Sequence, residues 1–132
     1  MTKPIPPSAG ELYLSRQTPN TTQRQHVIAW LAHLDAQGYS PRSTEGYRER
    51  RLPFVTWCEE RGLLYAAQVS LEVLESYQRY LRSYRKADGQ PLVVGGQLNR
   101  LSAIRNCWRW LLKRHVILYN PADLLNCQRP QN

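Results

Sequence analysis

The sequence predicts an all-α domain in which two helical hairpins pack into one bundle. Apolar residues recur at intervals of three and four along several segments, as they do on the buried face of a helix. Helix-start signals separate these segments, the clearest being Ser40-Pro41 and Asn120-Pro121. Residues 57–64 also resemble residues 110–117, and both stretches are expected to close the second helix of a pair.

The first helix is expected to begin near Thr22 and to stop at Gly38. The segment before it is rich in proline and has no sustained period, so residues 1–21 are predicted to form a flexible arm. Spacing assigns five residues to the buried face of this helix: Val27, Ile28, Trp30, Leu31 and Leu34.

The second helix is predicted to begin at Ser40 and to run toward Gly62. Ser40 supplies a hydroxyl cap, and Pro41 at the first helical position has no N–H that would be left unbonded. Pro53 is expected to kink or break this helix, because an interior proline costs about 3 kcal/mol. The predicted apolar side consists of Tyr47, Phe54, Val55, Trp57 and Cys58.

Two further helices and a short final turn complete the bundle. Ser70 is predicted to cap the third helix, which ends before the turn at residues 86–91. The fourth follows Gly95-Gly96, and Asn120-Pro121 opens the last turn. We therefore expect the folded domain to span residues 22–126 and a linker to start at residue 127, over residues 127–132. The predicted buried residues are Leu71, Leu74, Tyr77 and Leu81 in the third helix, and Leu98, Leu101, Ile104, Trp108, Leu111 and Leu112 in the fourth.

Positive charge is concentrated in one part of the chain. The 132 residues carry 18 basic and 10 acidic side chains, a net charge of +8. Residues 79–114 hold nine basic side chains against Asp88 alone, whereas residues 1–78 and 115–132 are each neutral. A basic half of this kind indicates a polyanionic partner, nucleic acid before membrane.

The sequence excludes several common kinds of site. It contains no nucleophile elbow, phosphate-binding loop, zinc-protease motif or dinucleotide-binding turn. Three widely spaced cysteines argue against a disulfide framework or a cysteine-rich zinc site. We therefore predict no catalytic residues, no metal and no cofactor. No apolar run is long enough to span a bilayer, and no secretion signal is present, which predicts a cytoplasmic location.

Two predicted helix starts carry side chains suited to DNA. A helix start offers free N–H groups to a phosphate, and hydroxyls and guanidinium groups add further donors. Asn and Gln can pair with adenine, and Arg with guanine, so the fourth helix is the better candidate for reading bases. The candidate DNA-binding residues are Arg42, Ser43, Thr44 and Arg48 in the second helix, and Gln97, Asn99 and Arg100 in the fourth.

The order of these elements resembles the N-terminal core-binding domain of the tyrosine recombinases, the phage-integrase family. The resemblance covers about residues 23–126. Arg51 stands where the family usually has an apolar residue. The matching motifs are residues 38–44 (GYSPRST), Tyr47-Arg48, Phe54, Trp57, Gly62-Leu63, residues 70–81 (SLEVLESYQRYL), residues 88–92, residues 100–105, Trp110-Leu111 and residues 120–122.

This resemblance implies a SAM-like bundle of four to five helices that forms one jaw of a clamp on double-stranded DNA. The second and fourth helices are expected to face the major groove of a recombination half-site, with both helix starts and the surplus arginines on one side. The family's catalytic Arg, Lys, His and Tyr belong to a following domain, so we expect this chain to bind DNA without cutting it. The complete recombinase would form a tetramer on DNA, and this chain alone is expected to be monomeric.

Two other functions fit the residues. A helix-turn-helix regulator would use the short junction at residues 38–41, with a recognition helix that protrudes from the fold. A helical protein-interaction module would use Tyr and Trp side chains as anchors, and its basic residues would be incidental.

Overall fold

Four α-helices and two short 3-10 turns make up the described part of the chain. The computed structural model describes residues 21–125, and within them the predicted all-α class is confirmed. The only extended pairing described there is a single bridge between Arg85 and Pro91. No described helix is long and apolar enough to cross a bilayer. The elements are α2 (Gln23–Ala36), α3 (Pro41–Glu59), η1 (Ala66–Gln68), α4 (Leu71–Ser83), α5 (Val94–Lys113) and η2 (Pro121–Leu124).

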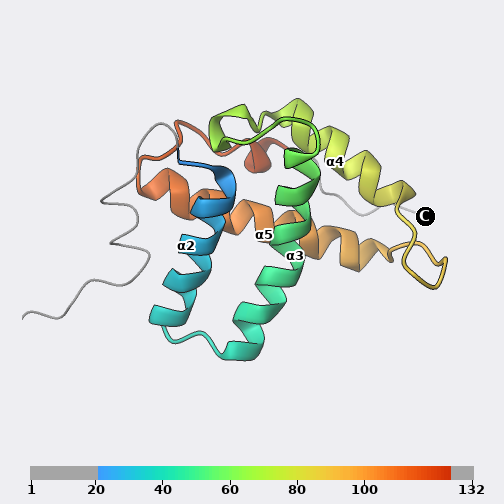
Figure 1. Cartoon of the computed structure of the whole chain (residues 1–132), viewed down its shortest axis with the longest axis horizontal. Coiled ribbons are helices and arrows are strands. Elements are labelled where there is room, and N and C mark those ends of the chain that lie inside the picture. The colour runs from blue at the N-terminus through green and yellow to red at the C-terminus, as the bar shows by residue number, and fades with distance from the viewer. Residues whose placement is uncertain (1–20, 126–132) are drawn as a thin grey trace, which may run out of the picture.

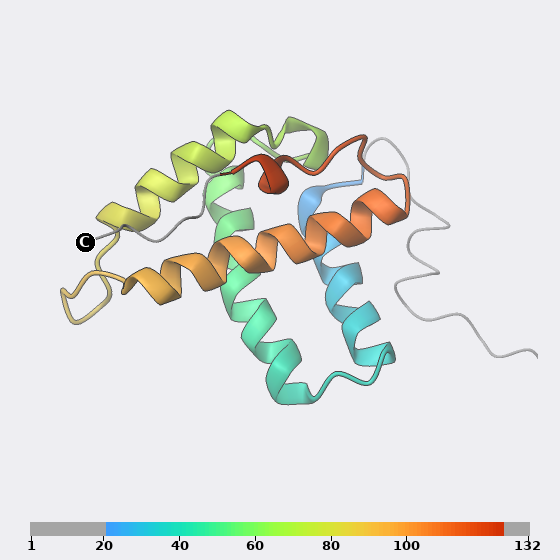
Figure 2. The same ribbon diagram turned by 180° about the vertical axis from the view of Figure 1, so that it is seen from behind.

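α2 and α3 form a helical hairpin, α5 crosses it, and α4 packs at one end of it. α2 and α3 lie side by side, joined by a short turn at the hairpin tip (Figure 1). α5 crosses one face of this hairpin, as seen from behind in Figure 2, and α4 lies at the end away from the tip. The predicted arm and linker, residues 1–21 and 127–132, lie outside the described residues apart from Thr21.

The helix starts predicted at Ser40, Ser70 and Asn120 are where the sequence places them. The Ser40 hydroxyl accepts a hydrogen bond from the Ser43 N–H at 3.1 Å, and the Ser70 hydroxyl accepts one from the Val73 N–H at 3.2 Å. The Asn120 side chain accepts from the Ala122 N–H at 3.0 Å. Each cap satisfies an N–H that has no partner within its helix, and this fixes where the helix begins.

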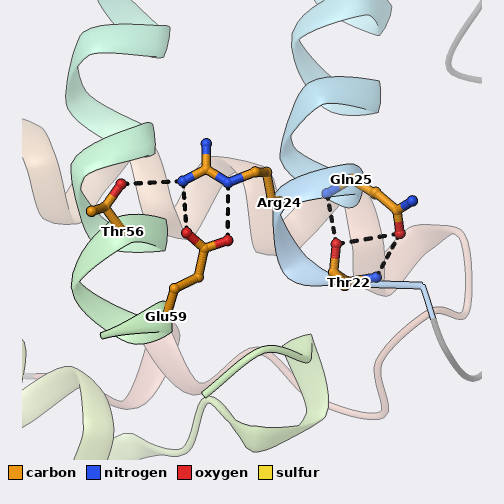
Figure 3. A network of polar contacts seen from close by, with 5 residues as sticks. All are labelled: Thr22, Arg24, Gln25, Thr56 and Glu59. Carbon is orange, nitrogen blue, oxygen red and sulfur yellow. Dashed lines mark hydrogen bonds and ion pairs between the residues drawn. The ribbon is translucent and has the colours of Figure 1, made fainter. Parts of the chain in front are cut away.

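Figure 3 shows how the base of the hairpin is held. Thr22 caps α2 reciprocally with Gln25: the Thr22 N–H donates to Oε1 of Gln25 at 2.9 Å, and the Gln25 N–H donates to the Thr22 hydroxyl at 3.3 Å. Beside this cap, the Arg24 guanidinium donates twice to the Glu59 carboxylate, at 2.9 and 2.8 Å, and once to Thr56 at 3.1 Å. This bidentate pair joins α2 to α3, and hydrogen bonding to Arg24 lowers the pKa of Glu59.

The core follows most of the predicted stripes, but Leu98 and Leu112 of α5 are only half-buried and lie outside it, and α2 carries one further error. Val27, Trp30, Leu31 and Leu34 are buried, but Ile28 is 50% exposed. The buried face of α2 instead continues toward its start through His26 and Gln23, which are 4% and 1% exposed. Spacing alone assigned the apolar Ile28 to that face, although it lies to one side of it. Burial lowers the pKa of His26 to about 4.

α3 does not break at Pro53, and the alternative, a kink about one turn before the proline, stays a prediction. The helix is continuous from Pro41 to Glu59, and Pro53 lies on its exposed side. Tertiary packing compensates for the lost backbone hydrogen bond, because both turns around the proline are fixed by buried residues: Arg51, Phe54, Val55 and Cys58. α3 therefore packs against α2 and α5, and it does not protrude as the recognition helix of a helix-turn-helix protein does.

Arg51 is the most unusual member of the core. It is fully buried, and its guanidinium lies over the Trp108 ring at 4.3 Å and the Phe54 ring at 5.1 Å. One terminal nitrogen donates to Oε1 of Gln23 at 3.1 Å. Arg51 thus contacts α2 and α5 from the middle of α3, and burial lowers its pKa.

Candidate nucleic-acid interface

The start of α3 lies at the hairpin tip and presents most of the predicted side chains to solvent. Arg42, Ser43 and Arg48 are exposed. The Ser43 hydroxyl accepts a hydrogen bond from the Ser40 hydroxyl at 3.0 Å, and Arg48 lies 3.5 Å from the Glu45 carboxylate. The first turn therefore offers one guanidinium group, a hydroxyl and the N–H groups of a helix start to an anion, and Arg48 adds a second guanidinium one turn further along α3.

Thr44 is placed differently from its neighbours. Its side chain is 5% exposed, and its hydroxyl donates to the Ser40 carbonyl at 3.3 Å. In this position Thr44 stabilises the first turn of α3 from the inside.

The start of α5 separates its three predicted side chains. Val93 precedes the helix and makes no side-chain cap, and Gly95 and Gly96 already lie in the first turn. The Gln97 side-chain amide donates back to the Leu92 carbonyl at 3.0 Å, while Asn99 is exposed. α5 thus begins at Val94, ahead of the two glycines that it was predicted to follow, with free N–H groups and small residues at its start.

Arg100 faces away from Asn99. It lines a cavity of about 290 Å³ between α3, α4 and α5, together with Trp57, Tyr77 and Tyr80. Burial raises the pKa of Tyr77 to about 12, and the neighbouring Arg100 acts in the opposite direction. Because Asn99 and Arg100 are consecutive residues of a helix, they lie on different faces of α5.

The two helix starts lie at separate corners of the molecule. The start of α3 is at the hairpin tip, whereas α5 begins next to the end of α4, and both views agree on this (Figures 1 and 2). The two starts are therefore not adjacent, and their lying on one side of the molecule stays a prediction. The cause is the crossing angle of α5, which the sequence does not encode locally: α5 passes over α3 near its middle, so its start extends beyond the hairpin.

A polar stripe along α5 connects these two regions. From Asn99 its members follow at intervals of three and four residues, so they share one face of the helix. Asn106 is half-buried and the other four are exposed, and every member can donate hydrogen bonds. The stripe consists of Asn99, Ser102, Asn106, Arg109 and Lys113. Sequence reasoning examined only the start of this helix, although the same spacing rule would have identified the whole stripe.

Several arginines are committed to contacts within the protein. Arg24 pairs with Glu59, Arg51 is buried, and Arg61 lies over the Trp57 ring at 4.1 Å. Arg105 lies 3.6 Å from Asp123 and also donates to the Ala122 carbonyl at 3.4 Å, which holds η2 against α5. Arg109 lies 3.8 Å from the same carboxylate, but its side chain is 57% exposed. The cations on the α5 stripe are thus more accessible than those beside it.

Comparison with curated proteins gives one informative match. Over 98 residues the sequence is 42% identical to tyrosine recombinase XerC 2 of Ralstonia nicotianae (strain ATCC BAA-1114 / GMI1000). The chain is homologous to a tyrosine recombinase. No family model matches the chain, and no solved structure matches it.

The homology concerns one part of the recombinase. The match covers 72% of this chain and 28% of XerC 2, so the shared region has about the size of a single domain. The four packed helices described above are consistent with a core-binding domain of a tyrosine recombinase, which is the resemblance that the motifs predicted.

Proposed function

We propose that this chain is the DNA-binding domain of a tyrosine recombinase and that it holds double-stranded DNA at a recombination half-site. The start of α3 contacts phosphates through Arg42, Ser43 and Arg48. The α5 stripe faces the major groove, with Asn99 toward the base edges. Strand cleavage belongs to a catalytic domain outside the region shared with this chain.

One observation carries this proposal: the α5 stripe contains donors and cations, and no acidic side chain belongs to it. A helix face that contacts only solvent tolerates acidic residues. A face that binds a polyanion does not, because acidic side chains would repel it. Homology to a tyrosine recombinase supports DNA as the polyanion that this stripe binds. Gln97 and Arg100 lie near the start of α5 on faces other than the stripe, and we place them at the margin of the contact.

The test is selection of DNA from a random duplex library by the wild-type chain, followed by binding measurements on the selected sequence. Asn99→Ala is expected to weaken binding by about 1–3 kcal/mol and to relax the preference at one base position. Arg42→Ala and Arg48→Ala are expected to weaken binding to every sequence alike, since phosphates carry no sequence information.

Arg79→Ala is the matched control, because it removes an exposed arginine from α4, away from both regions. If the wild-type chain does not bind duplex DNA even at low salt, the proposal is wrong and a protein-interaction module becomes the better explanation. If Asn99→Ala selects the same sequence as wild type, α5 does not read bases.

A further inference from the structure

We infer that a groove between the hairpin tip and the C-terminal half of α5 holds a phosphodiester group of the DNA backbone, an inference that rests on the proposed function. The groove has a volume of about 450 Å³. It lies between the C-terminal half of α2, the α2–α3 turn and the first half of α3 on one side, and α5 on the other. Its polar walls are formed by Gln37, Tyr39, Tyr47, Asn106, Arg109 and Lys113.

The lining of the groove suits an anion. Its polar side chains all carry N–H or O–H donors, and no carboxylate is among the residues that line it. Arg109 and Lys113 lie four residues apart, so their charges stand one helical turn from each other. The Asp123 carboxylate contacts Arg109 at 3.8 Å from outside this lining and pairs with Arg105 as well. The groove therefore combines two accessible positive charges with neutral donors on the opposite wall.

Aromatic rings pack against one another along both walls of the groove. Trp30 contacts the Tyr47 ring edge-on at 5.3 Å, and Tyr39 contacts Tyr47 at 6.4 Å. On the α5 side, His33 lies against Trp110 at 5.2 Å. Packed rings exclude water, and an ion pair formed against them is screened less than one on an open surface. The site is thus organised before a ligand arrives.

The position of the groove identifies DNA as the source of the phosphate. Arg109 and Lys113 end the same stripe that begins at Asn99, and 14 residues of helix span roughly 21 Å. The major groove of DNA is about 12 Å wide. A helix that turns Asn99 toward base edges therefore carries its far end over the phosphates that border the groove.

The experiment measures the affinity for a short duplex over a series of NaCl concentrations. The double variant Arg109→Gln/Lys113→Gln is expected to reduce the slope of log K against log salt by about one, since each neutralised phosphate contributes about 0.9. The neutral variant Gln37→Leu should weaken binding about three- to tenfold with no change in slope, as expected for the loss of one hydrogen bond.

The matched control is Arg79→Gln/Arg82→Gln, which removes the same charge from exposed positions on α4. It should change the slope less than the groove variant does. Equal slopes for the two double variants would overturn the inference, because only total charge would then matter. Loss of binding for Asn99→Ala and Arg42→Ala but not for the groove variant would overturn it and leave the proposed function intact. A failure of wild type to bind duplex DNA would overturn both.

Inorganic phosphate separates the two sources of the ligand. At matched ionic strength it is expected to displace DNA no better than chloride does, since one phosphate bound alone lacks the contacts made by the rest of the duplex. If it displaces DNA more strongly, and the groove variant removes this difference, the site takes free phosphate and the assignment to the DNA backbone is wrong.

Discussion

At the scale of single residues, α3 and α5 end in the same pattern of backbone hydrogen bonds, although the side chains at the two ends differ. After α3, the N–H of Gly62 donates to the Glu59 carbonyl and that of Leu63 to the Cys58 carbonyl. After α5, His115 and Val116 make the equivalent bonds. Both are Schellman endings, which need a left-handed residue. Gly62 has φ +75°, and His115, at the equivalent position of the predicted repeat, has φ +60°.

His115 is therefore expected to cost stability that glycine would not. A side chain in the left-handed region costs about 1–2 kcal/mol, and part of this is offset by the greater unfolded-state entropy of glycine. We expect His115→Gly to raise the free energy of unfolding by about 0.5–1 kcal/mol, as measured by urea denaturation.

The reverse substitution at the equivalent position is the control. Nothing lies within 4 Å of a Cβ placed on Gly62, so Gly62→Ala tests the backbone alone. It should lower the free energy of unfolding by about 1 kcal/mol. If both variants leave the urea midpoint unchanged, these residues are not strained in the folded chain.

Arg51 shows what residue-level reasoning could not foresee. The charge of an arginine predicts a surface position, where Arg51 would add a phosphate donor to the second helix, and the usually apolar family position is the one sign against this. Its burial depends on two rings that come from different helices, Phe54 and Trp108. Since Trp108 is 57 residues away along the chain, no local pattern indicates that it covers the guanidinium.

At the scale of helices, α3 shows that tertiary packing can override the low helix preference of a proline. Pro53 cannot donate to the carbonyl four residues before it, yet the helix continues through it. The break that local preference allows does not occur, because the buried residues on either side of Pro53 need the helical arrangement to reach α2 and α5.

Pro53→Ala should therefore stabilise the protein. It restores one backbone hydrogen bond at an exposed position, and we expect the free energy of unfolding to rise by about 1–3 kcal/mol. Urea denaturation followed by circular dichroism at 222 nm measures this, as an upward shift of the midpoint with unchanged m. A loss of stability would instead mean that the proline ring itself contributes packing to the cavity that it lines with Trp57 and Tyr80.

At the scale of the whole molecule, the net charge of +8 is divided between structural and accessible cations. Arg24 is held by an ion pair, whereas the guanidinium groups of Arg51 and Arg61 lie over aromatic rings. The cations of the α5 stripe and of the α3 start remain exposed. The accessible positive charge, rather than the total, governs the response of DNA binding to salt.

Binding of duplex DNA by the 132-residue chain is expected to be weak and strongly dependent on salt. If about four to six phosphates are contacted, log K should fall with log salt at a slope near −4 to −5. Fluorescence anisotropy of a labelled duplex over a salt series measures this slope. A slope close to zero would show that binding does not depend on the phosphate backbone, which contradicts the proposed phosphate contacts.

The sequence by itself determined the fold class, the helix starts at Ser40, Ser70 and Asn120, most of the buried stripes and the basic character of the second half. These features depend on contacts within one or two turns, so local spacing encodes them. Only the tertiary structure decided that α3 continues through Pro53 and that Arg51 is buried. It also decided that the two helix starts lie apart and that the α5 stripe leads into a groove at the hairpin tip. Each of these depends on contacts between helices whose side chains are far apart in the chain, which local spacing does not encode.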